Sequence, residues 1–286
     1  MTLILGMSKD EGVYLSVDYR VTNLETGKVV DDLTVKFLTV MYPPDQIGPN
    51  ALLAYTGLAY ARDGTPIGGW MHVTLRGESE HFDASMAHVR SRLDRDIAPM
   101  GVGLIINALV VHGEKRYIGG LSNIEGSKLS PVWKVRDSFG YSMNELSDLM
   151  AVANGSGAQA TVTGGHLDAM SRQLTIRPRR IEDHMNLLAT INKRVAAVEL
   201  TVSPHCHVAF LNADGRYDPV ARNYAEGQTL PLTMRTLLFG IDLSVISEPL
   251  FHQFAEDGRV SEIDRDKVNR KLQRRPDGAV RRRMTA

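Results

Sequence analysis

The chain has 286 residues, 43% of them hydrophobic, and its 33 lysines and arginines balance 33 aspartates and glutamates. This length supports a full core in one large domain or two small ones, and the zero net charge argues against a nucleic-acid binder, which normally carries a basic excess. A single cysteine, Cys206, excludes an intrachain disulfide and fits a reducing compartment. Because no signal-peptide pattern and no apolar run of about 18 residues is found, we expect a cytoplasmic protein without a membrane span.

The first 60 residues predict β-structure. A polar, Gly-ended segment at 8–12 separates two short β-rich runs and is typical of a hairpin turn. Two further strands follow before residue 60, and a Pro/Gly-rich break at 43–50 divides them. We expect strands over 2–7, 12–20, 33–42 and 51–59.

The middle of the chain predicts helices and strands in separate runs. Pro66 suits the first turn of a helix over 65–77. Apolar residues at helical spacing predict helices over 81–98 and 180–198, and β-rich stretches lie at 101–113, 115–123 and 201–216. Such segregation favours an α+β layered fold over alternating βαβ units.

The C-terminal part differs from the rest. We expect one domain over residues 1–215 and a C-terminal extension over 216–286, whose charged end begins at about residue 259. Residues 265–286 hold nine arginines and lysines against two aspartates, so this tail is +7 and the remainder of the chain is −7. A basic tail is usually a solvated end, although it could instead dock on an acidic neighbouring subunit.

Thr2 is the first candidate for chemistry. A threonine hydroxyl is a poor nucleophile until a base takes its proton, and an N-terminal threonine carries its own base, an α-amine with a pKa of about 8. This arrangement requires removal of Met1, which a small second residue permits. A lysine near the amine would lower the pKa of the amine and would itself need a carboxylate. Lys36, which interrupts an apolar run, and Asp18, at the end of the second strand, are the candidates.

These residues belong to an ordered set of short motifs. Thr2 is followed by D-x-R-x-T at 18–22, by Lys36 inside a strand, by Y-T-G-L-A at 55–59 and by G-S-G at 155–157, which opens a predicted helix. Together they resemble the proteasome β-subunits and the bacterial proteasome-like threonine peptidases over about residues 2–212. The resemblance implies a four-layer αββα sandwich of the N-terminal nucleophile hydrolase type.

The resemblance also implies a role for each matching residue. Thr2 would be the nucleophile, Asp18 and Lys36 would tune its amine, and the Gly57 backbone N–H would lie in the oxyanion hole. Ser156 and Ser203 would complete the hydrogen-bond network. The segment formed by Arg20, Val21 and Thr22 would bind an extended substrate as an added strand.

The sequence departs from the family at the last of its motifs. Where the family carries D-x-x-S-G-G, this chain has Ser203 followed by Pro204 and His205 in place of the glycines. Leu200 stands where the aspartate is expected, with Glu199 one residue away. Residues 205–207 read His-Cys-His, but no third metal ligand is evident, and packing is the favoured interpretation.

Two classes of function follow from these observations. The first is an N-terminal threonine hydrolase that cleaves peptide bonds inside a homo-oligomeric ring, without a cofactor or metal and with a possible unfoldase partner. The second is a non-catalytic scaffold subunit of the same fold. An amidase with a non-peptide substrate shares the chemistry of the first.

Overall fold

A computed structural model describes residues 2–23, 26, 28–41, 49–77, 82–126, 134–146, 150–175, 180–213, 220–224, 236–238 and 240–242. This part of the chain is a mixed α/β structure with two large sheets and one small one. Met1 and the basic tail from about residue 259 lie outside the described residues. None of the helices in the described ranges combines the length and apolarity that crossing a membrane requires.

The five-stranded sheet carries the N-terminus of the described chain. Its order is β10-β1-β2-β11-β12, and every neighbouring pair is antiparallel. The predicted hairpin around residues 8–12 forms its centre, with Lys9 paired to Gly12. Its strands are β1 (Leu3–Lys9), β2 (Gly12–Asp18), β10 (Met150–Gly155), β11 (Cys206–Asn212) and β12 (Val220–Tyr224).

The seven-stranded sheet has the order β14-β13-β5-β6-β7-β8-β9. Strand β13 joins β5 in parallel, and the other pairs are antiparallel. Its strands are β5 (Phe37–Met41), β6 (Asn50–Gly57), β7 (Leu104–His112), β8 (Lys115–Glu125), β9 (Lys134–Glu145), β13 (Thr236–Leu238) and β14 (Ile241–Asp242). A separate two-stranded sheet consists of β3 (Val21–Thr22) and β4 (Val29–Asp31).

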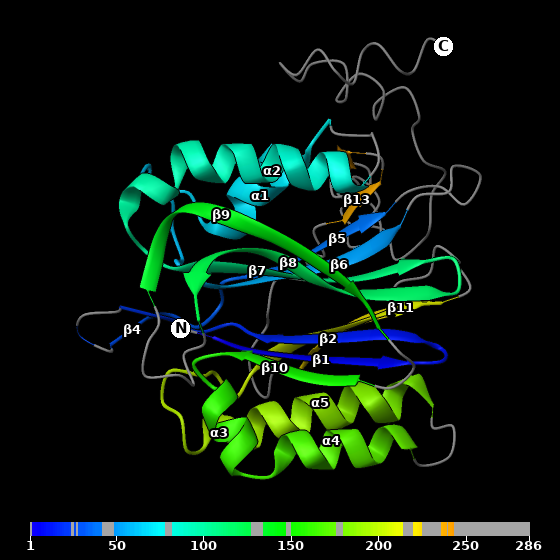
Figure 1. Ribbon diagram of the computed structural model, residues 1–286. Helices are drawn as coiled ribbons and strands as arrows, with labels where there is room; N and C mark the ends of the chain where they lie inside the picture. The colour runs from blue at the N-terminus through cyan, green and yellow to red at the C-terminus, as the bar shows by residue number, and fades with distance from the viewer. Residues whose placement is uncertain are drawn as a thin grey trace, which may run out of the picture.

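The helices lie on the outer faces of the two large sheets. Figure 1 shows α1 and α2 against the seven-stranded sheet and α3 to α5 against the five-stranded sheet, with the two sheets facing each other between them. The helices are α1 (Ile67–Leu75), α2 (Phe82–Asp96), α3 (Ala158–Thr163), α4 (His166–Thr175) and α5 (Ile181–Ala196), with a 3-10 turn at Ala98–Met100. The helices predicted over 65–77, 81–98 and 180–198 are confirmed.

Three apolar clusters correspond to the three interfaces between these layers. One lies between α1, α2 and the seven-stranded sheet, one between the two sheets, and one between the five-stranded sheet and α4 and α5. Alternation along β2 sends Val13, Leu15 and Val17 between the sheets and Tyr14 toward the helices. The two sheets are therefore buried on both faces over much of their area.

Several details differ from the sequence prediction. Lys36 does not lie within a strand but immediately precedes β5. The direction of its side chain is therefore not set by the alternation of side chains along that strand. Helix α5 turns His184 and Met185 toward the five-stranded sheet, and both residues are buried. The described residues beyond 215 add β12 to one large sheet and β13 and β14 to the other. The extension thus completes both sheets in its described part, and position 215 does not separate two structural units there.

Candidate active site

The Thr2 side chain lies at the start of β1 in a buried ion-pair site. Lys36 Nζ donates to Thr2 Oγ1 over 2.6 Å and lies 3.3 Å from Asp18 Oδ1. The ammonium also donates to the Arg20 carbonyl. Thr2, Asp18 and Lys36 are each no more than 2% exposed. The structure thus brings together three residues that lie 16 to 34 positions apart in the sequence.

The Asp18 carboxylate is held by backbone amides as well as by Lys36. Leu3 N–H donates to Oδ1 over 2.9 Å, and the N–H groups of Arg20 and Ser203 donate to Oδ2 over 3.0 and 2.9 Å. Charge-assisted bonds of this kind compensate for the loss of water around a buried carboxylate. They also fix Asp18 as the point where β1, the turn after β2 and the 199–205 segment meet.

Burial governs the protonation of Lys36. Removal from water lowers the pKa of the Lys36 ammonium below its usual value, and the Asp18 carboxylate partly offsets this effect. The three contacts named above all use acceptor atoms, which suits a protonated lysine. Because Lys36 donates to Thr2 Oγ1, the proton of the Thr2 hydroxyl is directed away from the lysine.

The Thr2 backbone nitrogen begins a chain of hydroxyl groups. It donates to Ser156 Oγ over 3.2 Å, and Ser156 Oγ lies 2.9 Å from Thr201 Oγ1. The Thr201 hydroxyl donates to Glu199 Oε1 over 2.6 Å. The Thr201 hydroxyl donates its one proton to the Glu199 carboxylate, so it must accept a hydrogen bond from the Ser156 hydroxyl. Ser156 Oγ in turn accepts from the Thr2 N–H. A partly buried polar chain therefore connects Thr2 N to Glu199.

Sequence reasoning missed the roles of Glu199 and Thr201 in this chain. The two residues lie in a turn after α5, where the Glu199 carboxylate also accepts from the Thr201 N–H over 3.1 Å. The signal was present in Glu199, one residue from the expected aspartate. The turn places the Glu199 carboxylate within hydrogen-bonding distance of the Thr201 hydroxyl, and Thr201 in turn contacts Ser156.

Gly57 ends β6 on the same side of the molecule as Thr2. Its φ of +104° is one that a residue with a side chain rarely adopts. Gly155, which ends β10 in the other large sheet, has a similar requirement, because a Cβ there would lie 2.0 Å from the Thr2 carbonyl oxygen and 3.1 Å from Thr56 Oγ1. Thr56, next to Gly57, is thereby placed close to the Thr2 backbone.

No protein-family model matches this chain, and no curated protein does either. The interpretation of the site therefore depends on its geometry and on its chemistry.

The Ser203 and Arg20 side chains form their hydrogen bonds with residues other than Thr2. Ser203 serves the site through its backbone N–H, while its Oγ accepts from the His205 N–H over 3.2 Å. The Arg20 guanidinium forms two 2.8 Å bonds to Asp32 and also donates to the Leu200 and Val202 carbonyls. These intramolecular contacts connect the end of β4 to the 199–205 segment through Arg20, and the predicted contact of Arg20 with a substrate stays a prediction.

Val21 and Thr22 form the short strand β3 directly after Arg20. They pair with Asp31 and Val29 of β4, with an irregular register between the two pairs, and both are buried. The predicted pairing of this segment with a substrate stays a prediction.

The two histidines of the 205–207 stretch do not share a face. His205 precedes β11 and lies at the surface, whereas His207 is buried between the sheets and stacks on Phe37 with ring centroids 4.7 Å apart. His205 lies outside β11, so the alternation of side chains along that strand does not determine where His205 points relative to His207. Over the described ranges, no cluster of three or more histidines, cysteines or carboxylates is arranged to hold a metal.

Acidification is expected to destabilise the protein through His207. Burial lowers the pKa of His207 to about 4, from an ordinary 6.5. The unfolded chain therefore takes up a proton first as pH falls, and stability is lost between about 6.5 and 4 by on the order of 3 kcal/mol. Urea unfolding of wild type and His207→Phe at pH 7 and pH 4.5 measures this contribution. The variant should lose less stability on acidification, and an equal loss in both proteins would contradict the assignment.

Proposed function

We propose that this protein is an N-terminal threonine hydrolase of the N-terminal nucleophile type, with an αββα sandwich, that cleaves peptide bonds after removal of Met1. The observation that carries the proposal is the 2.6 Å contact between Lys36 Nζ and Thr2 Oγ1, backed by Asp18. The layered arrangement of helices and sheets and the order of the sequence motifs support the same conclusion.

The mechanism begins with proton transfer within Thr2 itself. With Met1 removed, the free α-amine takes the hydroxyl proton, and the Lys36 ammonium stabilises the developing alkoxide through its hydrogen bond to Oγ1. The alkoxide attacks the substrate carbonyl and forms a tetrahedral oxyanion, to which the Gly57 N–H donates. Collapse breaks the C–N bond, the α-ammonium protonates the departing amine, and an ester to Thr2 is left. Water activated by the same amine then hydrolyses this ester.

The Ser156–Thr201–Glu199 chain orients the base. The α-amine keeps its contact with Ser156 Oγ in this scheme, so its lone pair is directed toward the Thr2 hydroxyl. Glu199 fixes the polarity of the chain because a carboxylate can only accept. Glu199, acting through Thr201, thus supplies the carboxylate that the altered 199–205 motif lacks at position 200.

Thr201→Val is expected to lower kcat by roughly 10- to 100-fold with little change in KM, since it breaks the chain without altering side-chain shape. Steady-state kinetics on a peptide substrate provide the measurement. Thr163→Val, at an exposed threonine of α3, is the matched control and should retain wild-type kinetics. A wild-type kcat in Thr201→Val would remove the hydroxyl chain from the mechanism.

A scaffold without turnover is the second candidate, and the burial of Thr2 favours it. Thr2 is only 2% exposed, so substrate access requires movement of the surrounding residues. As a scaffold, the protein would retain the Asp18–Lys36 pair for packing. In either case we propose assembly into a homo-oligomeric ring, and a peptidase in such a ring could depend on an unfoldase.

Digestion of an unfolded model protein distinguishes the candidates. Reduced and alkylated casein is incubated with the purified protein, and the products are analysed by mass spectrometry for new peptide termini. Cleavage that a β-lactone abolishes supports the peptidase. Hydrolysis of small amides alone would favour the amidase over the peptidase. Inactivity toward both substrate classes would favour the scaffold without turnover.

A further inference from the structure

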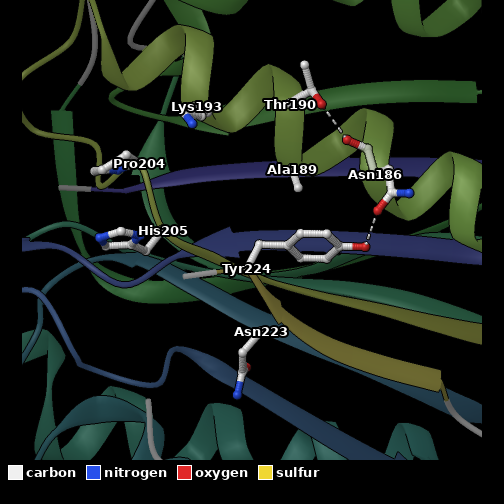
Figure 2. Close-up of a pocket in the computed structure, with 8 residues that line it drawn as sticks. All are labelled: Asn186, Ala189, Thr190, Lys193, Pro204, His205, Asn223 and Tyr224. Carbon is white, nitrogen blue, oxygen red and sulfur yellow. Dashed lines mark hydrogen bonds between the residues drawn. The ribbon is translucent and has the colours of Figure 1, made fainter. Parts of the chain in front are cut away.

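A pocket of about 660 Å³ lies on the outer side of the five-stranded sheet, away from the Thr2 hydroxyl. It is formed by α5 from Asn186 to Lys193, the segment that precedes β11, and the end of β12. The volume falls in the range of small-molecule sites in proteins. Figure 2 shows the residues that line it, which are Asn186, Ala189, Thr190, Lys193, Pro204, His205, Asn223 and Tyr224.

The two ends of the pocket differ in chemistry. Lys193 and His205 lie at one end with Pro204 between them, and both present nitrogen atoms (Figure 2). At the other end, Tyr224 Oη donates to Asn186 Oδ1 over 2.8 Å, and the Thr190 hydroxyl donates to the Asn186 carbonyl over 2.7 Å. None of the described residues that line the pocket carries a carboxylate, although the Asp32 carboxylate, which is paired with Arg20, interacts electrostatically with His205.

The middle of the pocket is apolar and flat. The Tyr224 ring lies along it in Figure 2, with the Ala189 methyl group above and the Pro204 ring toward the end with Lys193 and His205. A planar ligand can therefore stack on the tyrosine while an anionic group attached to it reaches Lys193 and His205. Such a ligand matches the shape of the pocket and presents an acceptor to the nitrogen atoms of Lys193 and His205.

We propose that this pocket binds a small organic anion with a planar apolar body, held through a carboxylate or phosphate at Lys193 and His205. The Lys193 ammonium supplies charge, the His205 imidazole supplies a second donor, and the Tyr224 ring supplies the stacking surface. The proposal concerns binding alone and does not depend on hydrolysis at Thr2.

The pocket walls are continuous with the segment that anchors Asp18. Pro204 follows Ser203, whose N–H donates to Asp18, and Asn192 of α5 donates to the Ser203 carbonyl over 2.8 Å. On β12, the Asn223 side chain points away from α5 (Figure 2), and its Oδ1 accepts from Tyr19 Oη over 2.6 Å. A ligand that bridges Lys193 and His205 therefore links α5 to the segment that precedes β11, and occupancy should raise the melting temperature.

Ligand-observed NMR titration of the full-length protein tests the proposal with three probes of similar shape. Benzoate and phenyl phosphate carry the two anionic groups, and benzamide is the neutral counterpart of benzoate. We expect either anion to bind more tightly than benzamide, and the tighter of the two identifies the preferred head group. If neither anion binds more tightly than benzamide, or neither binds at millimolar concentration, the proposal is overturned.

Two variants locate the binding. Lys193→Met should weaken binding of the preferred anion by roughly tenfold or more, because a hydrogen bond to a charged group is lost. Arg194→Met removes the same charge from the neighbouring exposed position, which does not line the pocket, and should bind like wild type. Thr190→Trp, at an exposed lining position, should block binding by filling the pocket. Unchanged affinity in both Lys193→Met and Thr190→Trp would place the ligand elsewhere.

Discussion

Thr2→Ala is expected to reduce peptide hydrolysis by about 10³-fold or more, because it removes the proposed nucleophile. Alanine is as small as threonine at the second position, so removal of Met1 should continue. Lys36 keeps its contacts with Asp18 and the Arg20 carbonyl, and the loss of one hydrogen bond should cost only about 1–2 kcal/mol of stability. The measurement is turnover on a fluorogenic peptide, together with thermal unfolding and sedimentation to establish that fold and assembly are retained.

Thr2→Ser is the matched control for this substitution. Serine keeps the hydroxyl oxygen that accepts from Lys36 and lacks only the methyl group, so measurable turnover should be retained. Wild-type hydrolysis in Thr2→Ala would refute the assigned mechanism regardless of the serine result.

Lys36→Met is the second substitution with a large expected effect. It removes the donor that stabilises the Thr2 alkoxide and the nearby positive charge, and kcat should fall by roughly 10²- to 10⁴-fold. Removing one partner of a buried ion pair normally costs about 3–5 kcal/mol. The cost here should lie at the lower end, because Asp18 keeps its three backbone N–H donors.

Lys9 offers a matched control for the loss of a buried lysine. It ends β1, seven residues from Thr2, is 6% exposed, and lies 3.8 Å from Glu11. Lys9→Met should therefore reduce stability without reducing kcat. The contradicting result would be a loss of kcat in both variants that follows their loss of stability. Lys36 would then have no specific role at Thr2.

The layered arrangement and most secondary-structure elements could be predicted because their signals are local. The run 12–20 is recognised by its β-branched and aromatic residues, and the helical spacing of Phe82, Met86, Val89 and Leu93 follows the buried face of α2. The later strands β12 and β13 are short and derive their pairing from β11 and β5, so nothing within residues 220–238 indicated them.

Four residues of the candidate site could be predicted from the sequence. Thr2, Asp18, Lys36 and Ser156 were proposed from the sequence, and they lie within hydrogen-bonding distance of one another as a connected set. The roles of Arg20, Ser203 and Glu199 were not predictable, because each depends on how the 199–205 segment turns after α5. That turn directs the Glu199 carboxylate to Thr201 and the Ser203 N–H to Asp18, and no periodicity in the sequence encodes it.

The most direct test of a live N-terminal nucleophile is the intact mass of the purified protein before and after reaction with a peptide epoxyketone. This probe needs both a free α-amine and the adjacent hydroxyl to form its ring adduct. We expect a protein that lacks Met1 and gains one adduct, which peptide mapping assigns to Thr2. A protein that retains Met1, or one that lacks Met1 and gains no adduct, would contradict the proposed chemistry.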